Sequence, residues 1–171
     1  INNRDGSVIN ISNADAIVNL NNVIIGETES ANAIVNAGTI NMTGGNILLN
    51  SGIKGGGITN ITGSEVVLNA GTSITQKQIN VQSGSLTLSN DSIINGILSI
   101  SSEGSATITT GALTSALAND GELNIFTDGT LAYNISGEGK TNINGNIINN
   151  AKISQDVDVI SGSLTTSAEN V

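Results

Sequence analysis

Hydrophobic and polar residues alternate in short runs along most of the chain. Two or three aliphatic residues, each separated by one other residue, recur with a period of two, which is typical of strands with one buried face. Gly, Asn and Ser punctuate these runs, and successive strand centres lie about 5–8 residues apart. The runs that we assign as strands are 40–42, 66–68, 79–81, 86–88, 98–100, 106–108, 123–125, 131–135 and 157–159.

These short strands combine into a longer period. From Ile40 to Leu98 the aliphatic runs recur about every 19–21 residues, and from Leu123 to Val159 about every 16–20 residues. Three short strands in about twenty residues describe one coil of a β-helix, whose backbone pairs with the coils above and below at about 4.7 Å. The sequence therefore predicts an all-β fold, a right-handed parallel β-helix (β-solenoid) of about eight coils of about 20 residues with a triangular cross-section.

The chain also contains an internal repeat. The segment INVQSGSLT at 79–87 recurs as VDVISGSLT at 157–165, and further blocks in the same order extend the match to 37–87 and 120–165. A repeat of about eighty residues corresponds to about four coils, which favours a repeat architecture. We therefore expect one solenoid domain at 1–171, with irregular end coils at 1–36, a first four-coil repeat at 37–119 and a second, partial repeat at 120–171.

Two segments carry more specific expectations. Asn tolerates left-handed turns, and stacked Asn side chains form ladders, so the two NAGT segments at 36–39 and 69–72 predict ladder-forming corners. GALTSALAND at 111–120 has Leu113, Ala116 and Leu117 at helix-like spacing. A wide turn is favoured there over a short helical excursion.

Composition supports an aliphatic, fully paired sheet. Hydrophobic residues make up 37% of the chain but aromatic residues only 1%, and Pro, which cannot donate to a sheet ladder, is absent. The net charge is −9 and the five cations are scattered, so nucleic-acid binding is not expected. The sequence has no run of 18 apolar residues, so we do not expect this segment to insert into a membrane. The chain begins at Ile1 without a signal-like segment, which we take to indicate a processed or excised piece.

Little in the sequence points to catalysis. The sequence contains no His and no Cys. This excludes catalytic triads that use His or Cys, and it excludes metal sites with imidazole or thiolate ligands. The best carboxylate pair, Asp156 and Asp158, is interpreted as a solvated strand face, with a weak Ca²⁺ ligand pair or a catalytic dyad as alternatives. The only Arg, Arg4, lies in the irregular end. We therefore expect no catalytic, cofactor-binding or metal-binding residues and no cofactor.

Other candidate motifs are also weak. The GGG at 55–57 lacks the Lys that a phosphate loop needs, so it predicts a turn. Thr107-x-Thr109 is a single instance of the stacked Thr pattern of ice-binding solenoids. Phe126 is expected to face outward and Tyr133 inward, which leaves one exposed ring for binding a glycan.

The segment NAGTSITQKQINVQSGSLTLSNDSI at 69–93 resembles the β-helical passenger domains of autotransporters, particularly self-associating adhesins. The stretch at 118–154 resembles the degenerate coil repeats of large bacterial surface exoproteins. The resemblance covers about residues 36–171. It implies display on the bacterial surface and a role in adhesion, aggregation or biofilm formation, and it implies no catalytic residues.

The function expected from the sequence is therefore structural and adhesive. We expect a non-enzymatic segment of a bacterial surface or secreted protein that binds a host or neighbouring cell surface (protein or glycan) or associates with itself. The alternative is a fragment of a β-helical carbohydrate-active enzyme, a polysaccharide lyase or hydrolase. Three or more carboxylates within about 5–9 Å in a groove would favour that enzyme.

Overall fold

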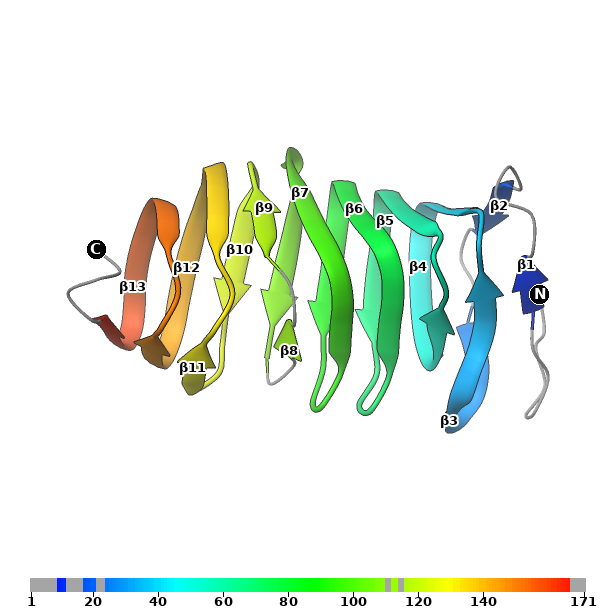
Figure 1. Cartoon of the computed structure of the whole chain (residues 1–171), viewed down its shortest axis with the longest axis horizontal. Coiled ribbons are helices and arrows are strands. Elements are labelled where there is room, and N and C mark those ends of the chain that lie inside the picture. Colours follow the sequence, from blue (N-terminus) through cyan, green and yellow to red (C-terminus); the bar gives the residue numbers. More distant parts are fainter. Residues whose placement is uncertain (1–8, 12–16, 21–23, 110–111, 114–115, 167–171) are drawn as a thin grey trace.

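The computed structural model of the chain describes residues 9–11, 17–20, 24–109, 112–113 and 116–166, with side chains from Ile34 onward except at 111–115. Within these residues all regular structure is strand. The chain forms an all-β parallel β-solenoid of about seven turns of about 19 residues. The predicted fold class is confirmed, with about one turn fewer than expected. Figure 1 shows the turns stacked along the long axis of the molecule, with β1 at one end and β13 at the other.

The strands follow the chain in order around and along the rod. Their bounds are β1 (Ile9–Ile11), β2 (Ile17–Leu20), β3 (Ile24–Asn36), β4 (Thr39–Lys54), β5 (Ile58–Leu68), β6 (Ser73–Leu88), β7 (Ile93–Ile108), β8 (Ala112–Leu113), β9 (Leu117–Asn119), β10 (Glu122–Ile125), β11 (Gly129–Leu131), β12 (Ile135–Asn149) and β13 (Ile153–Thr166).

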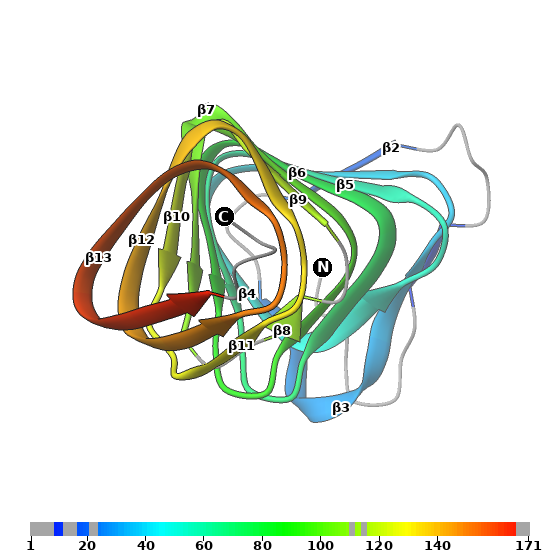
Figure 2. The ribbon, with the colours of Figure 1, turned by 60° about the vertical axis from the view of Figure 1, so that its left-hand side comes forward.

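Each turn lies in register on the turn before it, and the paired strands run parallel. Ile79 of β6 is the Cα partner of Leu98 of β7, and Leu98 is the partner of Leu117 of β9. Two register shifts divide the pairing of β6 with β7 into three segments, which match the three short strands predicted for each coil. Seen more nearly along the rod in Figure 2, the turns enclose a common interior.

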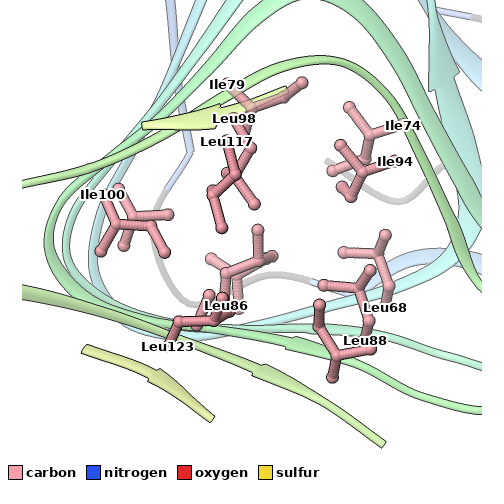
Figure 3. Close-up of a cluster of buried hydrophobic side chains, with 14 of the residues drawn as sticks. Leu68, Ile74, Ile79, Leu86, Leu88, Ile94, Leu98, Ile100, Leu117 and Leu123 are labelled. Carbon is pink, nitrogen blue, oxygen red and sulfur yellow. The ribbon is translucent and has the colours of Figure 1, made fainter. Parts of the chain in front are cut away.

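That interior is filled by columns of aliphatic side chains. The inward residues of most of the predicted alternating runs are buried, among them Ile79, Leu98 and Leu86, which Figure 3 shows pointing into the shared core. The run at 157–159 is the exception, because Val159 in the last described turn is 45% exposed. Stacking like on like lets branched aliphatic side chains interlock at close packing density. The sparse aromatic content follows, because Tyr133 is the one ring packed against this core in the described part of the chain.

The internal repeat of the sequence does not coincide with the stacking. Four turns beyond Ile79 its column reaches Ile153, whereas Val157, its match in the repeat, belongs to the column of Leu86. The two SGSLT copies therefore lie on different faces of the rod. The physical reason is that each face of a turn has the same short alternation ending in Gly or Ser, so similar segments fit any face.

The two NAGT segments likewise occupy different corners. Asn36 is buried, and its Oδ1 accepts a hydrogen bond of 3.0 Å from the backbone N–H of Gly38. Asn69 instead donates from its side chain to Oδ1 of Asn50, one turn earlier. The expected ladder step is thus present at Asn69, but Asn36 is a buried turn residue. An Asn two residues before a Gly forms a hydrogen bond within its own corner. Oδ1 of Asn119 likewise accepts a hydrogen bond of 3.2 Å from the backbone N–H of Gly121.

The segment 111–120 contains no helix in its described residues. Leu117 is buried in line with Leu98, and Asn119 is buried at the following corner. The helix-like spacing therefore arises because β8 and β9 lie on two faces separated by a corner. At the other end, the pairing of β3 with β4 contains two register shifts, as many as the pairing of β6 with β7, and the irregular end coils expected at 1–36 stay a prediction.

Candidate interaction surfaces

One outer face of the rod carries no acidic side chain over its described length, and the exposed cation Lys152 lies at its end, two residues before Ser154. Its first column contains small, mostly polar residues in register, and a second column lies beside it on the same strands. We call these residues together the neutral face: Asn41, Asn60, Asn80, Ser99, Ala118, Ser136 and Ser154 in the first column, and Thr39, Ile58, Gln78 and Ile97 in the second.

Side-chain amides on the neutral face form a ladder parallel to the rod axis. Nδ2 of Asn60 donates to Oδ1 of Asn41 at 2.9 Å, and Nδ2 of Asn80 donates to Oδ1 of Asn60 at 2.8 Å. Nε2 of Gln78 donates to Oδ1 of Asn80 at 2.8 Å, which joins the two columns. Sequence reasoning expected Asn ladders at corners and missed this one. The signal was an Asn recurring after 19 and 20 residues, each time between inward-facing positions.

The acidic side chains described by the structure all lie outside the neutral face. They occupy the corners and another face of the rod: Glu65, Asp91, Glu103, Asp120, Glu122, Asp128, Glu138, Asp156 and Asp158. Because the chain carries a net charge of −9, this separation leaves one face free of like-charge repulsion.

The densest group of acids surrounds a groove of about 580 Å³ at one corner of the later turns. The groove crosses β7, β10, β12 and β13. Its lining includes Glu103, Asp120, Glu122, Glu138 and Asp156, with Lys140 among them.

Stacked glycines form the corner beneath this groove. A Cβ built at Gly121 would lie 2.3 Å from the backbone oxygens of Gly104 and Ser101, and a Cβ at Gly139 would lie 2.4 Å from the oxygen of Gly121. Only Gly allows successive turns to approach this closely. The acidic residue that precedes each of these glycines is then brought to one edge of the groove. The signal in the sequence was EG, DG and EG at 103–104, 120–121 and 138–139, spaced by 17 and 18 residues.

Lys140 links the groove to the carboxylate pair singled out from the sequence. Its Nζ lies 2.6 Å from Oδ2 of Asp158, in an ion pair whose side chains are 52% and 57% exposed. The hydrogen bond to Asp158 raises the pKa of Lys140, and the charges of Asp158, Glu122 and Asp156 act in the same direction. Such an exposed pair contributes little to stability.

The arrangement of Asp156 and Asp158 agrees with a solvated strand. Both side chains are exposed on β13, while Val157 between them packs against the core. Across the described residues, no group of three or more acidic side chains is arranged to hold a metal ion. Oδ1 of Asp120 accepts a hydrogen bond of 3.0 Å from the backbone N–H of Glu138, so this carboxylate also joins two turns.

The remaining sequence candidates are dispersed. Phe126 is 51% exposed, as expected, while Tyr133 packs against the core and burial raises the pKa of its phenol. Thr107 stacks on Thr87, and Thr109 donates to a backbone oxygen, so no long Thr array forms there. The GGG at 55–57 joins β4 to β5 as a bend, as predicted. Arg4 lies outside the described residues.

Comparison with known proteins identifies no relative of this chain: no family model, curated protein or solved structure matches it. Among the residues described, no helix is long and apolar enough to cross a membrane.

Proposed function

We propose that the chain is a non-enzymatic adhesive segment of a bacterial surface or secreted protein and acts as a rod that associates with other surfaces. The observation that carries the proposal is the neutral face, an array of mostly small or hydrogen-bonding side chains that stack in register from turn to turn. The resemblance of residues 69–93 to self-associating adhesins supports the same assignment. Weak contacts repeated along a rod, and among many displayed rods, sum to firm attachment.

The acidic groove supports a second candidate, the carbohydrate-active enzyme, because five carboxylates line one cleft. A general acid of a glycoside hydrolase needs a pKa raised by a protected environment. The carboxylates of the groove are all exposed, and Phe126 and Tyr133 are absent from its lining. These features favour an electrostatic surface over a catalytic cleft.

A bead assay tests the adhesive proposal. Beads coated with the chain are mixed with one another, with bacterial cells and with extracellular matrix proteins. Clumping or attachment above that of albumin-coated beads is the expected result. Beads that neither clump nor attach to any of these partners contradict the proposal.

The enzyme candidate is tested separately by incubating the chain with neutral and acidic polysaccharides. The assay measures new reducing ends and the ultraviolet absorbance of unsaturated sugar products. We expect neither product to exceed the level produced by a chain with Glu122→Gln and Asp156→Asn. Product that forms with the unaltered chain and is lost in that variant would favour the enzyme.

A further inference from the structure

The last described turn of the rod leaves apolar side chains open to solvent. Ile143 and Ile147 of β12 are buried, whereas their Cα partners on β13, Val159 and Leu164, are partly exposed. Within the described part of the chain, β13 pairs with β12 alone, and Figure 1 shows it at one end of the rod. The other edge of β13 is therefore a sheet edge with an apolar surface beside it, which is the kind of edge that accepts another strand.

The internal repeat indicates which strand this edge accepts. The segment VDVISGSL at 157–164 of β13 matches INVQSGSL at 79–86 of β6. The two segments also share their backbone geometry, because Gly162 and Gly84 have φ values of 83° and 84°. At both glycines a Cβ would meet the backbone oxygen of the preceding turn. The end of β13 is thus locally equivalent to a part of β6 inside the rod.

In β6 the corresponding edge is occupied by β7. Over this segment β6 pairs with β5 on one edge, as β13 pairs with β12, and with β7 on the other. The Cα pairs between β6 and β7 are Ile79 with Leu98, Val81 with Ile100, Gly84 with Gly104 and Leu86 with Ala106.

We propose that the open edge of β13 binds one parallel strand of a partner chain that has the chemistry of β7. That strand carries two aliphatic residues in alternation, a Gly at the corner and a small apolar residue beyond it. It takes the register of β7 on β6, so its aliphatic residues cover Val157 and Val159. Backbone hydrogen bonds supply affinity in such strand addition, and the alternate side chains supply specificity. The site lies at the end of the rod and does not depend on the adhesive function of the neutral face.

Charge adds a preference at one position of the docked strand. Asp158 is exposed on the outward side of β13, and it corresponds in the repeat to Asn80, whose partner on β7 is Ser99. The residue of the partner strand at the position of Ser99 therefore lies beside this carboxylate. A Lys there is attracted to Asp158, and a Glu is repelled. We expect the partner strand to be neutral or basic at this position.

A synthetic peptide of residues 93–108 tests the site, because it has the sequence of β7. Its fluorescence anisotropy is followed as the full chain is added up to about 1 mM, since a short flexible peptide loses much conformational freedom on binding. A second peptide exchanges Leu98 with Ser99 and Ile100 with Ser101. This keeps the composition but moves the aliphatic residues to the outward side.

Two variants of the chain locate the binding. Val159→Asn makes the apolar end of the rod polar without adding charge. Ile148→Asn is the matched control on the side of the rod, because Ile148 is 55% exposed and Val159 is 45% exposed. Circular dichroism verifies that both variants retain the fold.

We expect the β7 peptide to bind the unaltered chain and the control alike, and to bind Val159→Asn at least about fivefold more weakly. The rearranged peptide should not bind. Ser99→Lys in the peptide should tighten binding about twofold or more at low salt, and the difference should shrink at high salt.

The inference is overturned if the β7 peptide shows no saturable binding, if both peptides bind equally, or if Val159→Asn binds as well as the control. A Lys peptide that binds no tighter contradicts the register. Sedimentation of the chain alone tests a different occupant. Self-association that is lost in Val159→Asn would mean that a second copy occupies the edge, which also overturns the inference.

Discussion

Nδ2 of Asn80 donates a hydrogen bond of 2.8 Å to Oδ1 of Asn60, the residue one turn earlier in the same outer column. The side chains thereby repeat, on the surface, the parallel hydrogen bonding of the backbone beneath them. Each amide fixes the orientation of the next, because its oxygen accepts from one neighbour while its nitrogen donates to the other. The neutral face is therefore ordered by the same stacking that builds the core.

Replacing the middle amide tests the contribution of this ladder. Asn60→Ala removes a bond to Asn41 and a bond from Asn80. At about 0.5–1.5 kcal/mol for each hydrogen bond, the free energy of unfolding is expected to fall by about 1–3 kcal/mol. Urea unfolding measures the change. Asn46→Ala, at an exposed position of β4, is the control and is expected to shift stability by no more than about 0.5 kcal/mol.

A second ladder ends where Asn142 meets Asp158. Nδ2 of Asn142 donates to Oδ1 of Asn124 at 2.9 Å, but its own Oδ1 is buried without a partner, because its register partner Asp158 is acidic. Asp158→Asn supplies the missing donor, whereas Asp158→Ala does not, and both lose the exposed ion pair with Lys140. We expect the Asn variant to be about 1 kcal/mol more stable than the Ala variant in urea unfolding. Equal stability of the two variants would show that the ladder cannot be extended.

The stacked glycines beneath the acidic groove give a sharper stability prediction. Gly121→Ala places a Cβ against two backbone oxygens, so successive turns must separate. We expect it to destabilise the fold by at least about 2 kcal/mol, comparable to overpacking in a core. Gly56→Ala meets no atom within 4 Å and serves as the control, with a thermal midpoint close to that of the unaltered chain. A tolerated Gly121→Ala would contradict the close approach of the turns at this corner.

Tyr133 makes stability depend on alkaline pH. Burial raises the pKa of its phenol above the ordinary value of about 10, so the folded state holds the proton while the unfolded state releases it. Stability from this residue is complete below about pH 10 and is lost as the pH rises above that value. Urea unfolding between about pH 9 and pH 11.5 should therefore show a steeper loss for the unaltered chain than for Tyr133→Phe. Lys140 is present in both chains, so its own alkaline titration does not affect the difference.

Absorbance provides an independent check, since Tyr133 is the only Tyr of the sequence. Phenolate absorbance of the folded chain should develop at higher pH than that of the urea-unfolded chain. Coincident titrations, or identical pH profiles of the two variants, would contradict burial of this ring.

The fold class was predictable because alternation and a period of about twenty residues depend on local sequence. Ile79, Leu98 and their equivalents were correctly assigned to the interior for that reason. The match of Ile79 with Val157 misled because each face of a turn uses the same alternation, so sequence similarity cannot determine which face a segment occupies. The face that a segment occupies depends on the summed lengths of the turns that precede it, and the length of a turn varies by a residue or two.

The surfaces were less predictable than the core. Asp156 and Asp158 were found as neighbours in sequence, but their relation to Lys140 depends on register across turns. Glu103 and Asp120 share a groove because stacked glycines bring their turns together, a feature visible only as sparse acidic-Gly pairs. The neutral face is defined by the absence of acidic side chains in stacked positions, so it can be recognised only when the register between turns is known.

The most direct measurement of the central claim, that residues about one turn apart stack on one outer face, uses nitroxide spin labels in this Cys-free chain. Ser136 and Ser154 are exposed Cα partners on the neutral face, and Ser136→Cys with Ser154→Cys provides two labelling sites. Electron paramagnetic resonance should show strong dipolar broadening, because neighbouring strands lie about 4.8 Å apart. Ser136→Cys with Thr130→Cys, on different faces, should show clearly weaker broadening. Sharp lines from the Ser136 and Ser154 pair, like those of the single-labelled chains, would contradict the stacked register and the neutral face built on it.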